Sequence, residues 1–539
     1  MRFYKYALYS LALFIVLADC LAKAAPGDVV IQFPTPGSCP TGLAFDGKNL
    51  WLADRKTDSL YMIDPGDGNV VKALESPGFR VEGLTAEGDR LWVLDIEEGV
   101  ALKLNPATGI VEKTIYVPCN SPQGLAWDGQ YLWVADYQDD KIYRISTEDG
   151  TTMSEIKAPS GTPQGLAFDG KYLWVSDRFR DMIYMVTPDN GEVVMNFESP
   201  SKYPRGIAYD GRFLWNVDYQ SDSLYKIVVD DTSLFRQFDG KKEILEYSHQ
   251  VRNYGPGSLT DLDIYIALPR DLPFQKLLDT LVFNPPPDDY REDQWGQKVA
   301  HYHYRDIPAG EVVTVSMTAR AELYRTRFYI HPDKVGNLNQ IPADIKKLYL
   351  IDGSKYWVDD DYIKKTAESI VGDETNCYWI ARRIFNYLIA NMKYELAGGW
   401  NVAPTVLKRG NGSCSEYSFV YIALCRAAGL PARYAGSVVI RGDDASTDDV
   451  FHRWVEVYLP NYGWIPIDPS GGDSDSPANQ ASAIGYLDNR FLITTIGGGG
   501  SEFLEWNYNS NEIWQSRGPC KIVTEHIGEW SPLPDSSGN

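Results

Sequence analysis

The sequence predicts three folded parts: an all-β propeller of about five blades over residues 25–232, a β-sandwich over 233–335, and a mixed α+β core over 336–535. Three observations lead to this prediction. A 41-residue pattern repeats through the first half of the chain. Longer alternating runs replace it near residue 232, and helical periodicity begins after about residue 336.

A short leader precedes these parts. Two basic residues stand before an apolar run at 7–17, and Ala22 and Ala24 form a small-residue A-x-A pattern. This arrangement is typical of a secretory signal peptide, which we assign to residues 1–24. No later stretch is apolar enough to cross a bilayer. We therefore expect a secreted, extracytoplasmic protein without a membrane span.

The composition narrows the partners. The 539 residues carry a formal net charge of −22, which makes nucleic acid and anionic membrane surfaces poor partners. Cysteine is sparse for a disulfide scaffold, because only six cysteines follow the leader. If one of them stays reduced for chemistry, the other five cannot all pair. The six are Cys39, Cys119, Cys377, Cys414, Cys425 and Cys520.

The first half repeats a unit such as PQGLAWDGQYLWVAD, with about four short apolar runs separated by D-G turns. This is the pattern of one propeller blade. We expect its tryptophan to fill the space between blades and its last aspartate to cap a turn. At a constant step of 41, the unit repeats Gly42, Gly83, Gly124, Gly165 and Gly206; Trp51, Trp92, Trp133, Trp174 and Trp215; and Asp54, Asp95, Asp136, Asp177 and Asp218.

The strand that closes the ring is ambiguous. The segments 29–33 and 234–238 both match the register of residues 193–197, so either can complete the last blade. A degenerate sixth blade is also compatible with the sequence. The repeats loosely resemble those of NHL-type propellers.

Longer strand-like runs follow, such as EILEYSHQVRNYG and GEVVTVSMTARAELY, with Gly-Pro and Pro-Pro-Pro turns between them. They predict a β-sandwich of roughly seven strands. His301 and His303 share one strand face, as metal ligands do, but no third ligand is evident and ordinary strand positions explain them.

Cys414 lies in the segment NGSCSEYS, between a tight turn and an expected helix. Ser413 and Glu416 form the S-x-x-E pattern of a capping box, which starts a helix at Cys414. Free backbone N–H groups and the positive end of the helix dipole stabilise a thiolate at that position. Cys414 is therefore the candidate nucleophile, with quiet packing as the alternative.

His452 opens a strand, FHRWVEVYL, and Asp468 ends the next one, GWIPIDPS. If the two strands form a hairpin with an odd-numbered loop, Asp468 lies diagonal to His452 on the same face. An even-numbered loop would place them on opposite faces. The spacing thus allows a Cys-His-Asp triad without requiring one.

The stretches GNGSCSEYSFVYIALCRAAGLPARYAGSVV and FHRWVEVYLPNYGWIPIDPS resemble the transglutaminase-like superfamily of papain-like cysteine enzymes. The resemblance covers roughly residues 336–535. It implies that Cys414 is the nucleophile, His452 the base and acid, and Asp468 the group that orients the imidazole. The family often has a small residue or cysteine after the histidine. Arg453 departs from that pattern, which is expected to narrow the cleft or alter substrate preference.

By this resemblance the protein is an enzyme that acts on amide bonds of proteins or peptides through a thioester, as a peptidase or an acyltransferase. Trp379 and Trp400 are candidates for a second oxyanion donor, with core positions as the alternative. The acidic loop 441–449 is a candidate calcium site, although a solvated loop is the simpler interpretation. No other cofactor is expected.

The alternative function is a non-catalytic binding module. In that interpretation the propeller holds a protein partner and the C-terminal core is vestigial.

Overall fold

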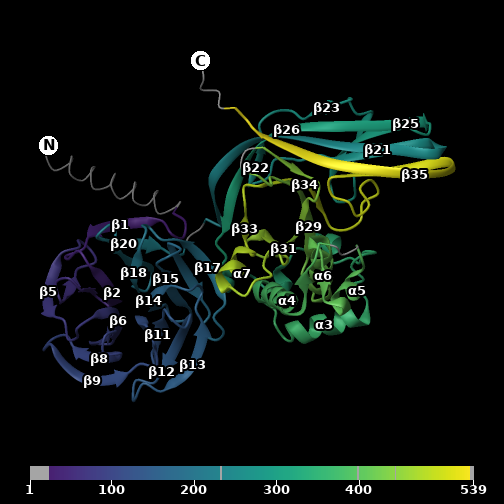
Figure 1. Cartoon of the computed structure of the whole chain (residues 1–539). Helices are drawn as coiled ribbons and strands as arrows, with labels where there is room; N and C mark the ends of the chain where they lie inside the picture. The colour runs from purple at the N-terminus through teal and green to yellow at the C-terminus, as the bar shows by residue number, and fades with distance from the viewer. Residues whose placement is uncertain (1–23, 231–232, 397–399, 443–444, 535–539) are drawn as a thin grey trace, which may run out of the picture. The chain divides into compact units, whose positions relative to one another are not determined.

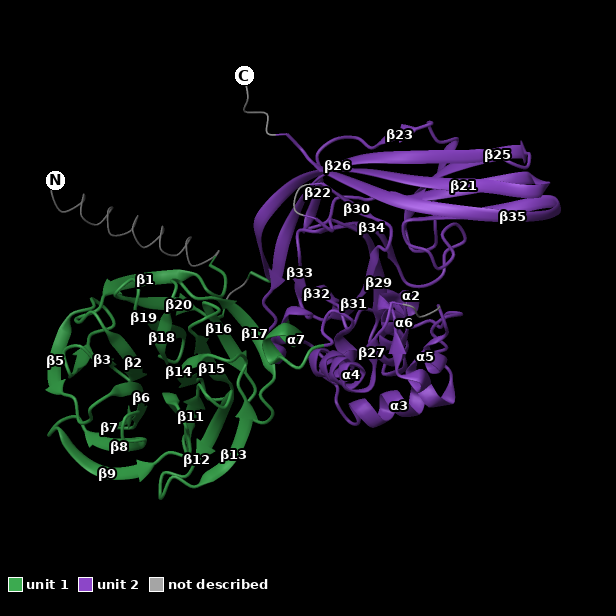
Figure 2. Cartoon of the chain, in the orientation of Figure 1, with its two compact units in different colours: residues 1–234, 474–481 green, residues 235–473, 482–539 purple. Residues whose placement is uncertain are grey.

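The structure is a computed structural model that describes residues 24–230, 233–396, 400–442 and 445–534. It consists of two compact units: residues 1–234 with 474–481, and residues 235–473 with 482–539 (Figure 2). All but the last residue of the expected signal peptide, 1–24, lies outside the described residues.

The described part of unit 1 is a propeller-like ring of five four-stranded antiparallel sheets (Figure 1). The first strands of the sheets, β2, β6, β10, β14 and β18, contact one another in sequence, and β18 contacts β2 to close the ring. The strands are β1 (Val29–Pro34), β2 (Pro40–Phe45), β3 (Leu50–Asp54), β4 (Ser59–Ile63), β5 (Val70–Glu75), β6 (Val81–Glu87), β7 (Arg90–Asp95), β8 (Val100–Asn105), β9 (Ile110–Tyr116), β10 (Pro122–Trp127), β11 (Leu132–Asp136), β12 (Lys141–Ile145), β13 (Thr152–Lys157), β14 (Pro163–Phe168), β15 (Leu173–Asp177), β16 (Met182–Val186), β17 (Val193–Glu198), β18 (Pro204–Tyr209), β19 (Phe213–Asp218) and β20 (Ser223–Val228).

The N-terminal strand completes the last sheet. β1 pairs with β20, with Gln32 opposite Tyr225, and supplies the fourth strand beside β18–β20. The competing segment, 234–238, instead leads into the first strand of unit 2. The structure therefore selects one of the two closures that the sequence allowed.

The repeated residues of unit 1 each have a physical reason. The five tryptophans are buried, and each indole N–H donates to a carboxylate five residues earlier, as Trp133 does to Asp128 over 2.9 Å. The aspartate that ends the strand caps the next turn: Asp54 accepts from the backbone N–H of Thr57 over 2.9 Å. The repeated glycines lie where neighbouring first strands meet. A Cβ at Gly124 would lie 2.2 Å from a backbone oxygen of the next sheet, so no larger residue fits.

Unit 2 contains a nine-stranded sheet in which β21, β26 and β35 run side by side as long strands (Figure 1). Its strands are β21 (Phe235–Ala267), β22 (Gln275–Leu277), β23 (Val282–Asn284), β24 (Asp289–Glu292), β25 (Lys298–Ile307), β26 (Val312–Phe328), β30 (Ser446–Asp448), β33 (Tyr486–Leu487) and β35 (Ser510–Pro532).

The two longest strands turn back on themselves. Ser510 is paired with Ile266, yet its hydroxyl lies 2.6 Å from the hydroxyl of Tyr247, on the same strand as Ile266. A straight strand would separate residues 247 and 266 by roughly 60 Å. The turns coincide with register shifts near residues 253–258. Two layers of strands therefore face each other around a shared apolar core.

β35 differs from the sequence-based boundaries. Its residues, 510–532, fall within the range predicted as the mixed core, 336–535, but the strand pairs with β21 along both layers. Nothing in the local pattern of these residues distinguishes a strand of one part from a strand of the other.

The mixed core of unit 2 consists of a four-stranded sheet, in the order β32-β31-β29-β34, and the helices beside it. Helix α6 is buried along almost its whole length and contacts β31 and β29 as well as α3, α4 and α5. The elements are α2 (Ala343–Tyr349), α3 (Asp361–Val371), α4 (Cys377–Asn391), α5 (Ala403–Arg409), α6 (Cys414–Ala427), β27 (Lys393–Tyr394), β28 (Asn411–Gly412), β29 (Ala432–Val439), β31 (His452–Leu459), β32 (Gly463–Ile467) and β34 (Phe491–Gly497). Helix α7 (Pro477–Ser482) belongs to unit 1 as far as Ala481, because Ala478 and Ala481 join an apolar cluster of that unit.

Among the described residues, no helix combines the length and the apolar character that a membrane crossing requires.

Candidate active site

Cys414 is the first residue of α6 and is 6% exposed. The helix begins here because the backbone N–H of Ser413 donates to the Glu416 carboxylate over 3.3 Å. Glu416 is itself buried and is held by the guanidinium of Arg409 at 2.7 Å and by the backbone N–H of Asn401 at 3.1 Å. The sulfur therefore sits at a helix start whose position is fixed by a buried carboxylate that is paired with a more exposed guanidinium.

His452 and Asp468 lie on one face of a hairpin. Leu459 pairs with Gly463 across a three-residue loop, 460–462, so the loop is odd-numbered. His452 Nε2 and Asp468 Oδ2 are 2.7 Å apart. The other carboxylate oxygen of Asp468 accepts from the Ser470 hydroxyl over 2.7 Å and from the backbone N–H of Gly471 over 2.9 Å. The carboxylate is thus held in place from both sides.

A side-chain hydrogen bond joins His452 and Cys414. Because Asp468 occupies Nε2 of the imidazole, Nδ1 is the nitrogen left for the sulfur. Phe491 stacks on the imidazole at a centroid distance of 5.6 Å and limits its rotation. The three residues singled out from the sequence, Cys414, His452 and Asp468, therefore form one contiguous group.

Their environment favours charge separation. Burial alone would raise the pKa of the Cys414 thiol, but the hydrogen bond and charge of His452 and the backbone N–H of Arg453 outweigh it and lower that pKa. Burial opposes a charge on His452 as well, yet the charge and hydrogen bond of Asp468 raise the pKa of the imidazole. Burial would raise the pKa of Asp468, and the imidazolium lowers it. The group is suited to a thiolate beside an imidazolium.

A cleft of about 300 Å³ opens beside Cys414. Trp400 lines it and is 37% exposed, so its indole N–H remains a candidate oxyanion donor. Trp379 is not among the described residues that line the cleft. It lies in the first turn of α4, where its backbone N–H donates to the capping side chain of Asn376 over 3.3 Å.

One wall of the cleft was not found from the sequence. Asn507, Tyr508 and Asn509 come from the segment before β35 and line the cleft together with the start of α6. A Cβ at Gly436 would lie 2.4 Å from the Cβ of Tyr508, so the tyrosine packs directly on the glycine. Neither residue carries a sequence signal that links them.

Arg453 does not narrow the cleft. Its side chain is buried, and its guanidinium carbon lies 4.4 to 5.2 Å from the rings of Trp400, Phe419, Tyr434 and Tyr508. The guanidinium donates to the backbone carbonyl of Trp506. The guanidinium therefore packs behind the cleft wall, and its positive charge lies over the faces of these aromatic rings.

In the described part of the loop 441–449, Asp448 is buried and already engaged. Its carboxylate accepts from the backbone N–H of Val439 over 2.7 Å and from the guanidinium of Arg441 over 2.9 Å. These bonds hold the loop in shape and leave Asp448 unavailable as a calcium ligand. Residues 443 and 444 of the candidate calcium site lie outside the described residues.

Comparison with known proteins identifies the region around this site. Residues 364–469 match the model of the transglutaminase-like superfamily, a span that contains Cys414, His452 and Asp468. Residues 364–469 are a transglutaminase-like domain. Within this span Cys414 begins α6, His452 begins β31 and Asp468 directly follows β32.

Two curated relatives match only part of the chain. The chain is 27% identical over 132 residues to an uncharacterized protein of Haemophilus influenzae, covering 20% of this chain and 36% of that protein. It is 34% identical over 82 residues to the uncharacterized protein YebA of Bacillus subtilis, covering 13% of this chain and 11% of that one. The chain therefore spans about a third or less of these relatives.

Among solved structures, the chain resembles that of a candidate cysteine protease from Cytophaga hutchinsonii, with 15% sequence identity and a TM-score of 0.38. The match covers 56% of this chain and 100% of the protease chain. This likeness is too distant to carry a functional argument.

Proposed function

We propose that this chain is an exported cysteine enzyme that acts on amide bonds of proteins or peptides. One observation carries the proposal: a buried cysteine at a helix start adjoins an imidazole whose far nitrogen is 2.7 Å from a carboxylate. The transglutaminase-like domain at 364–469 supports the same chemistry. The leader at 1–24 supports export.

In the proposed reaction, the Cys414 thiolate attacks the amide carbonyl carbon. The carbon–nitrogen bond breaks, His452 gives its proton to the leaving amine, and a thioester remains on Cys414. His452 then takes a proton from water or from an incoming amine, which attacks the thioester. The acyl group leaves as an acid or a new amide, and the thiolate–imidazolium pair is restored. Asp468 holds the imidazole through both steps.

The backbone N–H of Cys414, at the start of α6, supplies one donor to the oxyanion. The Trp400 indole, which lines the cleft, supplies the second.

The test is to incubate the mature protein with a protein substrate and a labelled primary amine. Label incorporation indicates transfer, new peptide termini indicate proteolysis, and deamidation alone indicates that water reacts at glutamine. The Cys414→Ala variant is the control and should abolish all three. The proposal fails if wild-type protein gives none of these products on any of a panel of unfolded protein substrates, or if Cys414→Ala retains activity.

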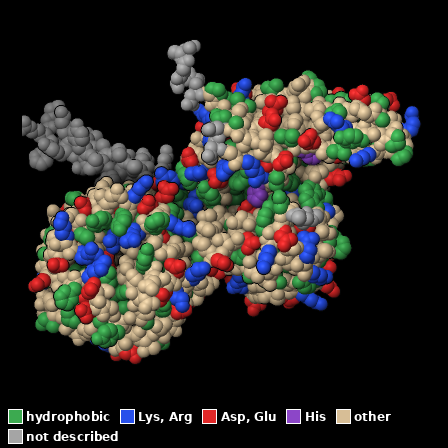
Figure 3. Space-filling view, viewed as in Figure 1, with side chains coloured by type: hydrophobic (Ala, Val, Ile, Leu, Met, Phe, Trp, Pro, Cys, Tyr) green, Lys and Arg blue, Asp and Glu red, His purple; other side chains and the backbone are tan. Residues whose placement is uncertain are grey.

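A second function, binding by unit 1, rests on a separate observation. A pocket of about 210 Å³ in that unit is lined by Arg55, Arg80, Arg178 and Arg205 around Glu82. Glu82 pairs with two of them, Arg55 at 2.9 Å and Arg205 at 2.7 Å, which leaves an excess of positive charge. Figure 3 shows Lys and Arg side chains on the visible face of this unit.

Such a pocket suits a carboxylate-bearing peptide. Fluorescence anisotropy with an acidic peptide and the Cys414→Ala protein tests this function. Binding should weaken in Arg178→Ala, and an unchanged affinity would contradict it.

A further inference from the structure

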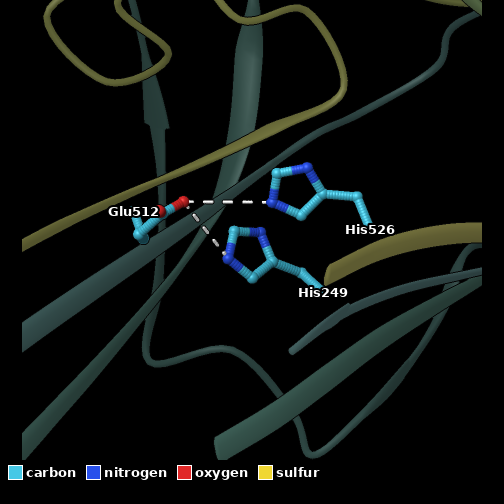
Figure 4. A group of neighbouring side chains, drawn as sticks. All are labelled: His249, Glu512 and His526. Carbon is cyan, nitrogen blue, oxygen red and sulfur yellow. Dashed lines mark ion pairs between the residues drawn. The ribbon is translucent and has the colours of Figure 1, made fainter. Parts of the chain in front are cut away.

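Two histidines and a glutamate converge between the two layers of strands in unit 2. His249 lies on β21, and Glu512 and His526 lie on different layers of β35, fourteen positions apart in sequence (Figure 4). Glu512 Oε2 is 3.5 Å from His249 Nε2 and 3.9 Å from His526 Nε2. One ligand atom from each residue lies within 4.8 Å of the other two.

The nitrogens that point inward have no hydrogen bond. His249 is fully buried, and both its Nε2 and that of His526 are buried atoms without a hydrogen-bond partner among the described residues. A buried polar atom left in this way costs about 1–3 kcal/mol. Neither His249 nor His526 takes part in the proposed thiol chemistry.

The nitrogen of His249 that faces away from Glu512, Nδ1, is hydrogen-bonded like the non-ligating nitrogen of a metal-bound histidine. Its Nδ1 is 2.8 Å from the hydroxyl of Ser510, which in turn is 2.6 Å from the hydroxyl of Tyr247. A hydrogen bond donated by Nδ1–H fixes the tautomer in which Nε2 carries the free lone pair.

The spacing also suits a metal ion. Ligand atoms at about 2.1 Å from a tetrahedral zinc ion lie about 3.4 Å from one another. The two separations from the carboxylate, 3.5 and 3.9 Å, exceed this value by only a few tenths of an ångström, and the two imidazole nitrogens lie within 4.8 Å of each other. Two imidazoles and one carboxylate are a ligand set that zinc-type ions accept, with one position left open.

We propose that His249, Glu512 and His526 bind one divalent transition-metal ion of the zinc class at the end of the cleft. Ser510 and His526 line the same cleft as Cys414, so the proposed site adjoins that cleft. The ion joins both layers of strands, because its ligands come from β21 and from two separate stretches of β35. This site does not depend on the proposed function.

A second histidine cluster in unit 2 lacks these features. The Asp263 carboxylate is 2.6 Å from His301 Nε2 and 3.0 Å from His303 Nδ1. Arg291 is 2.9 Å from the other nitrogen of His301. Hydrogen bonds and a cation already fill this cluster, so it serves as the matched control.

The experiment is a cobalt(II) titration of the untagged, chelator-stripped mature protein carrying Cys414→Ala, which removes the thiolate as a competing ligand. We expect d–d absorption bands that saturate at one equivalent and disappear when zinc is added. Glu512→Gln and His526→Gln should each weaken binding at least tenfold, whereas His303→Gln should leave it unchanged. Zinc should raise the thermal midpoint of the parent protein but not of the two ligand variants.

The proposal is overturned if the parent protein gives no saturable bands, or if either ligand variant binds cobalt as the parent does. It is also overturned if His303→Gln loses binding. Two ligand variants are compared because one of them can fail to fold, and the parent titration stands in either case. Since all these proteins lack the Cys414 thiol, the result is independent of whether the enzyme is active.

Discussion

Replacing Asp468 by Asn tests the charge relationship at the candidate active site most directly. The substitution keeps the shape of the side chain but removes the negative charge 2.7 Å from His452 Nε2. Without that charge the imidazolium is less stable, and the Cys414 thiolate loses the cation that lowers its pKa. We expect the thiol to be less ionised at neutral pH and to react more slowly with an electrophile.

The size of the change in labelling rate follows from the charged hydrogen bond that is lost. A hydrogen bond to a charged group contributes about 1.5–3 kcal/mol, and about 1.4 kcal/mol corresponds to a tenfold change. Alkylation of Cys414 at pH 7 should therefore slow by about 10- to 100-fold.

The assay is the second-order rate of iodoacetamide labelling, read from the Cys414 peptide by mass spectrometry between about pH 5 and 10. The wild-type thiol has a lowered pKa, so labelling should persist below the ordinary thiol pKa of about 8.5 and be lost only as the pH falls through the lowered value. In Asp468→Asn the whole profile should move to higher pH. Burial raises the pKa of Cys119, Cys377 and Cys425, so these thiols should label slowly.

The matched control is Asp473→Asn. Asp473 is a neighbouring carboxylate that accepts from the Tyr394 backbone N–H and the Tyr417 hydroxyl, at 3.1 and 3.3 Å. It should leave the labelling profile in place. Superimposable profiles for wild type and Asp468→Asn, in proteins of equal thermal midpoint, would refute the reasoning.

Three further outcomes are expected from single substitutions. Trp133→Ala removes a buried ring and its 2.9 Å bond to Asp128, and should lower the unfolding free energy of unit 1 by about 3–5 kcal/mol in urea titrations; a loss below about 1 kcal/mol would contradict its place in the core. Gly436→Ala forces Tyr508 out of the cleft wall. It should destabilise unit 2 by about 1–3 kcal/mol and reduce kcat/KM. Unchanged kinetics would show that this wall is dispensable for activity. Arg426→Met leaves three backbone carbonyls without their guanidinium donor, two of them in buried hydrogen bonds. It should cost at least about 1–3 kcal/mol, measured as a drop in the denaturation midpoint.

The candidate site was largely accessible from the sequence because its signals are local. A capping pattern marks the helix that begins at Cys414, and the spacing of His452 and Asp468 left one question, the parity of the hairpin loop. The three-residue loop answers it, since Leu459 pairs with Gly463. The resemblance to the transglutaminase-like superfamily then agrees with the match at 364–469.

Other features of the site could not be reached in this way. Tyr508 enters the cleft from a segment some seventy residues after the glycine on which it packs. Arg453 was expected to narrow the cleft or alter substrate preference. Its guanidinium instead packs behind the cleft wall, against four aromatic rings. Contacts of this kind depend on how separate strands are layered, which no spacing along the chain records.

By itself the sequence determined the 41-residue repeat, the change of pattern near residue 232 and the helix start at Cys414, because alternation, turn residues and caps act over a few neighbouring positions. Only the tertiary structure decided that β1 closes the last sheet of unit 1 and that β35 pairs with β21. It alone brought His249, Glu512 and His526 to one point. The physical reason is that strand pairing joins backbone groups far apart in the chain, and several segments with the same alternation compete equally well for one edge until the whole core is packed.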